Sequence, residues 1–428
     1  MTEKTKKLRA NEVFTPGSFP THTYVQRQED LLEQRLRDGL ETKGQIISVS
    51  GPSKSGKTVL VERVVGREAL ITLTGAGIRD PEDIWARVLD WMATPDEMSA
   101  TDADSEAVTV EAKAKATVGF MGTGAELGAS VGDQKTTQKT ISVVTRRRGL
   151  SQVVREIADS DFVVLLDDFH YMPRDVQVES VKQLKEAARL GVKICTASVP
   201  HRSDDVVRAN PELRGRVLAL DLGYWNEADL RQIARLGFAK LNADLDGASL
   251  SQFVAETAGS PQLMQAICLQ TCFGSDLREE AGNPRSLKFS SAERTNILEA
   301  TSSVSDFRSL VEVLEGGPKT RGTERKTYKF ADGGEGDVYR CILRAIAADP
   351  PQLSFDYDEI TKRVGSLCRG EAPVGSSIIG SCEQMNKLAG EKFPTERVIE
   401  WDDQKQVFDV TDPYLIFYLR WSGLLKRD

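Results

Sequence analysis

The sequence predicts an α/β protein built on a parallel sheet, followed by a helical segment and a smaller domain of helices and a hairpin. Three observations predict this. A glycine-rich loop, residues 51–58, lies between an apolar strand candidate and a helical run. A second apolar run, residues 162–166, ends in two adjacent acids. Residues 336–428 show three helical patterns, a hairpin pattern and a final helix. Strands that alternate with helices along a chain are typical of a parallel sheet.

The composition is that of a globular protein. Of 428 residues, 40% are hydrophobic and 28% charged, and the formal net charge is -8. This excludes a disordered or collagen-like chain, and the length indicates two to three domains. An acidic balance also excludes a basic shell for polyanions, so any nucleic-acid contact needs a local patch. The six Cys and three His have neither disulfide-framework nor zinc-ligand spacing.

No segment of the sequence suggests a membrane or an export route. The basic N-terminus, residues 1–12, has no apolar stretch behind it, as a secretory signal would. No run approaches the roughly 18 apolar residues that a membrane helix needs. We therefore expect a cytoplasmic location and regard a membrane partner as unlikely.

The loop at residues 51–58 matches the pattern that holds the phosphates of a nucleoside triphosphate. Glycines let backbone N–H groups curl around phosphates, and the helix N-terminus adds its positive end. We expect Lys57 to reach the β- and γ-phosphates and Thr58 to hold Mg²⁺ through its hydroxyl. The loop residues predicted to bind the nucleotide are Gly51, Ser53, Ser55, Gly56, Lys57 and Thr58.

The second half of such a site is the acid pair Asp167-Asp168 at the end of the buried strand. Asp167 is the expected Mg²⁺ ligand, through water, at the sheet edge where open α/β sheets bind ligands. Asp168 is the candidate to polarise the attacking water. It is one methylene shorter than the commoner Glu, which predicts slow hydrolysis. The alternative for this strand taken alone is an ordinary core strand.

Further elements complete the sheet. Apolar runs predict strands at residues 69–74, 192–198 and 218–222, with helices at 81–92 and 178–190 between them. We expect Thr196 or Ser198 at the carboxyl end of its strand, where it could sense the γ-phosphate. The order of these elements resembles AAA+ ATPases of the replication-initiator type and the similar STAND switch ATPases.

That resemblance extends to particular motifs. Tyr24 and Val25, in the box Thr23–Arg27, resemble the segment that cradles adenine, which implies ATP as the nucleotide. Pro261, in Gly259-Ser-Pro, resembles the lid proline that touches the base in STAND proteins, and the double acid is also STAND-like. The resemblance covers roughly residues 20–275 and the C-terminal module.

Arg214 and Arg216 match the position from which initiator-type ATPases send an arginine finger into a neighbouring subunit. Arg216 directly precedes its strand and is the better candidate. The resemblance thus implies a homo-oligomer when ATP is bound. Alternatively, both arginines are solvated residues before a strand. The sequence lacks the lid arginine expected near Gly259, which argues against a fast AAA+ hydrolysis cycle.

Residues 336–428 resemble a winged helix. They hold 12 Lys and Arg against 15 Asp and Glu, and the would-be recognition helix carries Glu383 with only Lys387. Because DNA affinity follows the number of phosphates neutralised, we expect weak duplex binding and favour packing against protein. Residues 276–335 are interpreted as a basic linker, whose patch could contact phosphates, nucleic acid or a partner, or simply be solvated. Its basic residues are Lys319, Arg321, Arg325, Lys326 and Lys329.

An insertion at about residues 102–146 interrupts the core. Alternation over residues 108–131 predicts a long β-hairpin with a small-residue apolar face. Three interpretations remain: pairing between hairpins of neighbouring subunits or with a partner, insertion of assembled hairpins in a membrane, or a folded surface hairpin.

The predicted domains are an N-terminal linker and adenine-side box (1–43), a P-loop ATPase core (44–222), a helical lid (223–275), the basic linker and the winged helix. We expect an ATP-binding, slowly hydrolysing switch that oligomerises or signals to an effector in another polypeptide. STAND resemblance implies a role such as anti-phage defence. The alternatives are an ATP-dependent DNA-binding initiator or transposition-type regulator, and a non-hydrolysing nucleotide-binding scaffold.

Overall fold

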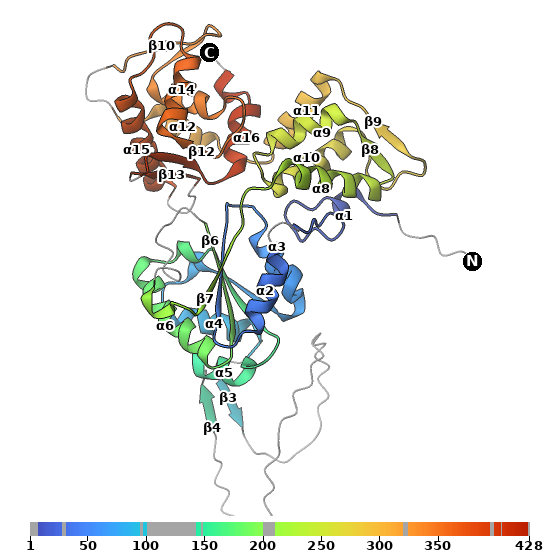
Figure 1. Cartoon of the computed structure of the whole chain (residues 1–428), viewed down its shortest axis with the longest axis vertical. Helices are drawn as coiled ribbons and strands as arrows, with labels where there is room; N and C mark the ends of the chain where they lie inside the picture. The colour runs from blue at the N-terminus through green and yellow to red at the C-terminus, as the bar shows by residue number, and fades with distance from the viewer. Residues whose placement is uncertain are drawn as a thin grey trace, which may run out of the picture.

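The computed structural model describes residues 7–27, 31–94, 97–100, 143–146, 149–199, 210–319, 324–393, 398–403 and 405–426. The chain forms a sheet-containing core, a helical lid and a C-terminal domain, and the lid and C-terminal domain sit side by side above the core (Figure 1). The predicted hairpin at 108–131 lies outside the described residues.

The core contains a five-stranded sheet in the order β2-β5-β6-β1-β7, and every pairing is parallel. Its strands are β1 (Ile46–Ser50), β2 (Leu70–Thr74), β5 (Val163–Asp167), β6 (Lys193–Ser198) and β7 (Val217–Asp221). All five strands were predicted from apolar runs, and the α/β fold class is confirmed. The carboxyl ends of β1 and β5 lie on the same edge with β6 between them, so the loop after β1 meets the acids after β5.

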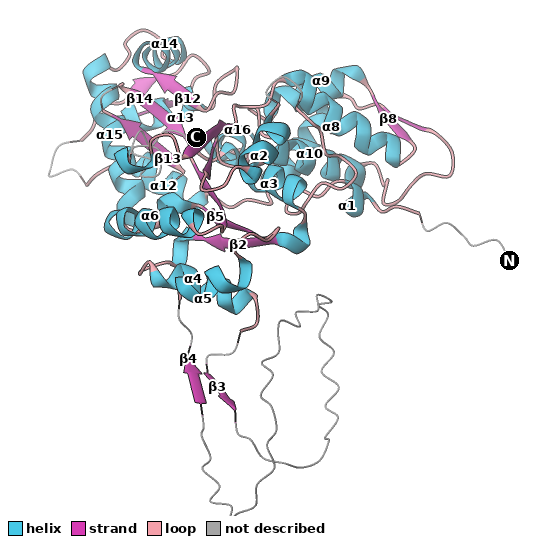
Figure 2. Cartoon of the chain, turned by 60° about the horizontal axis from the view of Figure 1, so that its bottom comes forward, coloured by secondary structure: helices cyan, strands magenta, loops and turns pink. Residues whose placement is uncertain are grey.

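Helices cover both faces of this sheet (Figure 2). On one face, α2 (Leu32–Glu41) and α3 (Lys57–Val65) pack through leucines and valines on residues such as Val49. On the other, α4 (Glu82–Trp91), α5 (Leu150–Ile157) and α6 (Arg174–Arg189) pack on the alternate side chains of the strands. Both faces being buried explains why β1 is buried at all five positions and carries no alternation.

The insertion leaves the core between α4 and α5. Its described ends form a short antiparallel pair, β3 (Glu97–Ala100) with β4 (Val143–Arg146). This pair projects from the end of the core that faces away from the lid and C-terminal domain (Figure 1). Residues 101–142 lie outside the described part of the chain.

The lid is a helical bundle with a small parallel strand pair. Its helices are α8 (Glu227–Lys240), α9 (Gly247–Glu256), α10 (Pro261–Gly274) and α11 (Ser291–Ser302), its strands are β8 (Ala243–Leu245) and β9 (Arg285–Leu287), and the N-terminal α1 (Ala10–Val13) packs on it. Phe14, just after α1, lies against Phe238 of α8 with ring centroids 5.0 Å apart.

The interpretation of residues 276–335 as a linker is wrong in structural terms. The segment contains β9, α11 and α12 (Arg308–Gly316), and α11 buries Ile297 and Leu298 in the lid core. Its basic and glycine-rich composition concealed these elements. A capping box was present in the sequence, because Ser290 and Glu293 satisfy each other's backbone N–H groups at the start of α11.

The C-terminal domain has the predicted helices and hairpin. They are α13 (Val338–Ile346), α14 (Tyr357–Leu367), α15 (Gly375–Lys392), the hairpin β13 (Ile399–Asp402) with β14 (Val407–Val410), and α16 (Pro413–Trp421). The structure adds α12, a short pair of β10 (Tyr328–Lys329) with β11 (Glu335–Gly336), and β12 (Ser354–Asp356) on the edge of β14. The winged-helix interpretation of this arrangement stays a prediction.

Helix α16 belongs to two hydrophobic cores at once. Leu415, Ile416 and Leu419 are buried in the C-terminal domain. Tyr414 and Phe417, on the opposite side of the helix, are buried in the lid. Since neither core is complete without this helix, the lid and the C-terminal domain are joined by a shared element rather than by a loose contact.

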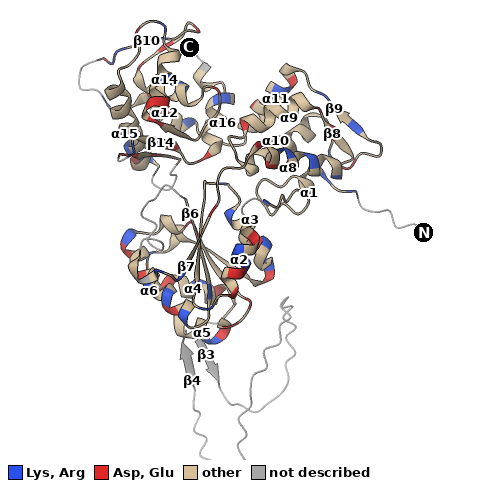
Figure 3. Cartoon of the chain, in the orientation of Figure 1, with Lys and Arg blue, Asp and Glu red and all other residues tan. Residues whose placement is uncertain are grey.

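Charges of both signs are interspersed along the surface helices, as along α2 and α6 (Figure 3). On α15, the exposed charges are Glu383, Lys387, Glu391 and Lys392, which sum to zero. Of the basic patch predicted at 319–329, Arg325 pairs with Asp337 at 2.7 Å and Lys326 with Glu371. Within the described ranges, no helix is long and apolar enough to cross a membrane.

Candidate nucleotide-binding site

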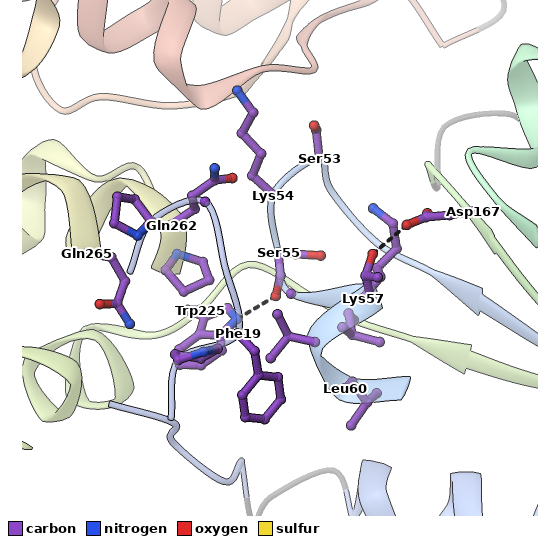
Figure 4. Close-up of a pocket in the computed structure, with 18 of the residues that line it drawn as sticks. Phe19, Ser53, Lys54, Ser55, Lys57, Leu60, Asp167, Trp225, Gln262 and Gln265 are labelled. Atoms are coloured by element: carbon purple, nitrogen blue, oxygen red, sulfur yellow. Dashed lines mark hydrogen bonds between the residues drawn. The ribbon is translucent and has the colours of Figure 1, made fainter. Parts of the chain in front are cut away.

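A cavity of about 680 Å³ lies where the core, the lid and the C-terminal domain meet. It is lined by the loop after β1, by residues 15–25 of the N-terminal segment, by the start of α10 and by residues 398–412. Its volume is in the range of small-molecule and cofactor sites. Figure 4 shows the loop running through it, with Trp225, Gln262 and Gln265 of the lid on one side.

The loop depends on two glycines for different reasons. Gly56, directly before α3, has φ +95°, in the region that favours glycine, and a Cβ there would meet nothing within 4 Å. Gly51 has no room, because a Cβ would lie 2.8 Å from the carbonyl oxygen of Leu222. The backbone between them therefore turns tightly and presents its N–H groups at the N-terminus of α3, which is an anion-binding arrangement.

Lys57 lies buried inside the loop, with 8% of its surface exposed. Its Nζ donates hydrogen bonds to the carbonyl oxygens of Gly51 and Pro52, each at 2.9 Å. Burial lowers the pKa of Lys57, and the nearby charges of Asp167 and Asp168 act in the opposite direction. The ammonium group is therefore placed to donate to phosphate oxygens instead of these carbonyls. Because phosphate oxygens are negatively charged, they would stabilise the buried ammonium more than neutral carbonyls do.

Thr58 and Asp167 come together as the sequence predicted. The Thr58 hydroxyl donates to Asp167 Oδ2 at 2.5 Å, across 109 positions of sequence. Two such oxygens suit Mg²⁺, which takes few protein ligands and completes its shell with phosphate and water. No three His, Cys, Asp or Glu side chains gather as metal ligands in the described residues. When bound, Mg²⁺ would neutralise charge on the phosphates.

Asp168 follows Asp167 with φ +54°, in the left-handed region that Asp tolerates better than most residues. Its backbone N–H donates to Asp167 Oδ1 at 2.9 Å, which fixes the first carboxylate. Burial and the neighbouring Asp167 charge raise the pKa of Asp168. Its carboxylate also lines the cavity, so it can accept a proton from a water there.

Ser55 shows that the loop fits an anionic ligand. Its hydroxyl oxygen is buried and has no hydrogen-bond partner among the described residues. A buried hydroxyl without a partner is costly, and a phosphate oxygen would supply one. The carbonyl oxygen of Ser55 is satisfied by Trp225, whose indole Nε1 donates to it at 2.9 Å. Sequence reasoning missed Trp225, because this contact joins residues 170 positions apart.

The adenine-side residues line the cavity as expected. Tyr24, Val25 and Pro261 all contribute to its wall. The Tyr24 hydroxyl donates to Glu33 at 2.7 Å, while Phe19 stacks on its ring at 6.1 Å. Burial and the hydrogen bond to Glu33 raise the pKa of Tyr24, so this phenol stays protonated.

Gln265 holds the N-terminal box against the lid. Its Nε2 donates to the Thr23 hydroxyl at 2.6 Å, and its Oε1 accepts from the Thr15 N–H at 3.3 Å. Phe19, Gln262 and Gln265, which all line the cavity, were not predicted. No local motif marks them, because their role arises only when the N-terminal segment packs on α10.

Three predicted residues are not among those that line this cavity: Gly51, Thr196 and Arg216. Of Thr196 and Ser198, the two candidates for the carboxyl end of the strand, Ser198 ends β6 and Thr196 lies two residues earlier. Thr196 pairs with Ser48 inside the sheet, is buried, and donates to the Ile47 carbonyl at 3.5 Å, while β6 continues to Ser198. Arg216 is exposed and precedes β7, at the sheet edge opposite the loop. It therefore lies away from the cavity of its own chain.

The C-terminal domain completes the wall of the cavity. Val398, Glu400, Thr411 and Asp412 line it together with the loop. Lys54, in the middle of the loop, forms an ion pair with Asp412 at 2.7 Å, and Figure 4 shows its side chain extending toward that domain. The sequence did not predict a contact between the loop and the end of the chain.

Parallel sheet, glycine loop, buried lysine and Thr58–Asp167 pair together define a P-loop nucleotide-binding fold. No protein-family model matches the sequence, and no curated protein matches it. Among solved structures, Cdc6p of Pyrobaculum aerophilum is 13% identical with a TM-score of 0.42, covering 98% of this chain and 99% of its own. The Walker-type ATPase PABY2304 of Pyrococcus abyssi is 14% identical with a TM-score of 0.46, and the match covers 98% of this chain and 99% of that protein. The ORC2 protein of Aeropyrum pernix, solved with ADPNP and ADP, is 12% identical with a TM-score of 0.45, again over 98% and 99%. The fold assignment rests on the sheet and loop themselves.

Proposed function

We propose that the protein is an ATP-binding and slowly hydrolysing molecular switch that oligomerises or signals to a partner protein. The observation that carries this is the hydrogen bond between Thr58 of the loop and Asp167, beside a cavity that residues of the lid and the C-terminal domain also line. A nucleotide in this position would touch all three parts of the chain. Its binding and loss would therefore change how they fit together.

The geometry of the site supports the following roles. Backbone N–H groups of the loop and Lys57 hold the phosphates, while Thr58 and Asp167 hold Mg²⁺. Tyr24, Val25 and Pro261 form the adenine side. Asp168 is the group that accepts a proton from the attacking water, and its short side chain supports slow turnover.

The position of Arg216 supports assembly of a homo-oligomer as the response to ATP. Because Arg216 lies away from its own loop, it can stabilise γ-phosphate charge only in a neighbouring subunit of a homo-oligomer. An effector protein in another polypeptide, as in anti-phage defence, would then respond to the assembled form.

The test is the particle mass in solution, measured by light scattering with ADP and then with a non-hydrolysable ATP analogue. We expect a rise in mass with the analogue alone and none in Lys57→Ala. Lys43→Ala removes an exposed lysine from the surface of the sheet domain. It serves as the matched control and should behave as wild type. An unchanged mass with bound analogue would contradict the assembly part of the proposal.

A second candidate is an ATP-dependent DNA-binding initiator or transposition-type regulator. The helices and three-stranded sheet of the C-terminal domain favour it, since that arrangement suits a winged helix. The zero net charge of α15 opposes it, because duplex affinity depends on phosphates neutralised. Fluorescence anisotropy with labelled duplex at about 50 and 200 mM salt separates the two. Tight binding that falls steeply with salt would favour the initiator.

A further inference from the structure

Lys54, in the loop that is proposed to bind the phosphates, contacts Asp412 of the C-terminal domain. Lys54 Nζ lies 2.7 Å from Oδ2 and 3.0 Å from Oδ1 of Asp412. The same ammonium lies 4.2 Å from the centre of the Tyr414 ring, a cation–π contact. Lys54 and Asp412 keep 29% and 17% of their side-chain surfaces exposed, so the pair is screened less than a surface ion pair.

The backbone of Lys54 supports a functional rather than incidental contact. Lys54 has φ +60°, a left-handed conformation that residues with a Cβ adopt uncommonly. Such conformations persist at sites where the surroundings determine them. Here the tight loop sets the direction of the side chain, and that direction leads out of the core to the start of α16.

Asp412 keeps a hydrogen bond at one of its carboxylate oxygens when Lys54 leaves. It is the N-cap of α16, where Oδ1 accepts from the Tyr414 N–H at 2.9 Å. The cap remains when the ammonium leaves. Lys54 is equally free to change partner, because an ammonium group carries three donors on a flexible stem and binds phosphate as readily as carboxylate.

A nucleotide in the cavity would weaken the Lys54–Asp412 ion pair. Asp412 lines the same cavity as Lys57 and Thr58, so its carboxylate would face the added phosphate charge. Like charges in a partly buried site repel strongly, and an opposite charge on the loop would attract Lys54. Lys54 would then move from Asp412 to the phosphates, and the repulsion would act on α16.

The movement would not stop at Asp412, because α16 is shared by the cores of the lid and the C-terminal domain. We propose that the Lys54–Asp412 ion pair is a latch that holds α16 on the empty loop and opens when a nucleoside triphosphate fills the loop. The inference rests on the proposed function and adds a route by which occupancy of the site reaches the C-terminal domain.

Hydrogen–deuterium exchange of the segment 407–421 tests the latch in the full chain, with binding of a fluorescent ATP analogue measured separately. In Asp412→Asn the carboxylate charge is lost while the N-cap is kept, since Asn caps as well as Asp. We expect exchange in this segment without nucleotide to be about five-fold faster than in wild type. Lys54→Gln breaks the pair from the other side and should give the same result.

Asp159→Asn is the matched control. It breaks the Lys43–Asp159 pair, which at 2.8 Å is of similar length to the 2.7 Å Lys54–Asp412 pair but is exposed on the surface of the sheet domain. We expect no change in the segment. In a Lys54→Gln/Asp412→Asn double variant the two effects should not add, since both remove one interaction.

In wild type, the analogue should speed exchange of the segment to the level of Asp412→Asn. Analogue binding with unchanged exchange would overturn the latch and leave the proposed function standing. Wild-type exchange in both single variants would also overturn it. A wild-type protein that binds no analogue would overturn the proposed function and, with it, the trigger of the latch.

Discussion

Arg420 and Glu256 form a two-point ion pair at the junction of the C-terminal domain and the lid. Arg420 Nε donates to Glu256 Oε2 and Nη2 to Oε1, both at 2.8 Å. Their side chains are only 9% and 8% exposed. The Trp421 indole donates to the same carboxylate at 2.8 Å, so Glu256 joins two successive residues of α16 to α9. This ion pair is more deeply buried than the Lys54–Asp412 pair, whose side chains are 29% and 17% exposed.

Glu256→Gln should destabilise the lid and C-terminal domain. Removing the Glu256 charge takes away the buried partner of Arg420 and leaves it the exposed Asp349, so we expect a cost of up to about 3 kcal/mol, or up to roughly 6–12 °C in melting temperature. Differential scanning calorimetry measures it. Glu279→Gln is the control, because the Lys7–Glu279 pair is 3.3 Å long and exposed, and exposed pairs contribute less than about 1 kcal/mol. Equal melting temperatures in both variants would contradict the assigned role.

Asp168→Asn should abolish most hydrolysis and preserve nucleotide binding. A positioned proton acceptor contributes roughly 10²–10⁴-fold, so we expect a fall of at least about 100-fold in the turnover rate. Phosphate release reports hydrolysis, and a fluorescent nucleotide reports binding. Undiminished turnover would mean that another group accepts the proton, or that none is needed.

The pH dependence of hydrolysis has a defined sign. Burial and the Asp167 charge raise the pKa of Asp168 above its ordinary 3.8, so it becomes protonated at a higher pH than a free Asp. Since the carboxylate is the active form, turnover should fall as pH is lowered and begin to fall above the usual range for Asp. A pH–rate profile at saturating ATP measures this. The residual rate of Asp168→Asn should lack this acid limb.

Asp168→Glu tests whether the short side chain limits the rate. The extra methylene brings the carboxylate nearer to a water in line with the γ-phosphate, so we expect faster hydrolysis than in wild type. The φ of +54° disfavours Glu slightly, and a melting curve checks that the variant is folded. A slower, folded variant would show that Asp168 already has the required reach.

Trp225→Phe should weaken ATP binding through the loop. The substitution keeps an aromatic ring and removes the donor to the Ser55 carbonyl, worth about 1 kcal/mol or a five-fold change in affinity. Titration of a fluorescent ATP analogue measures the Kd. Trp91→Phe, a change of the same chemistry on the far side of the core, should leave the Kd unchanged. The same Kd in both variants would contradict a contribution of Trp225 to ATP binding.

Arg216 is tested by mixing two inactive subunits. We expect Arg216→Ala and Asp168→Asn each to hydrolyse poorly, and their mixture to recover part of the turnover, because an intact arginine then faces an intact Asp168. Lys193→Ala, which removes a partly exposed cation at the start of β6, controls for charge. Turnover unaffected by Arg216→Ala would contradict a role in a neighbouring subunit.

Local patterns in the sequence were enough to predict the sheet and the loop that is proposed to bind phosphate. Five apolar runs became five parallel strands, because strands buried on both faces leave an unbroken apolar signal. Gly56, Lys57 and Thr58 are contiguous, so local spacing was enough to place them on the loop and the first turn of α3. Asp167 followed from the same logic, since parallel strands bring their carboxyl ends to one edge.

The contacts that the lid and the C-terminal domain make around that loop became apparent only in the folded chain. Trp225, Gln265 and Asp412 act on residues 170, 242 and 358 positions away, and no periodicity or motif encodes such a pairing. Thr196 was misplaced because β6 continues two residues further, to Ser198, and an unbroken apolar run does not mark the exact end of a strand. Contacts between domains depend on how separately folded surfaces meet, and local sequence patterns carry information only about each surface alone.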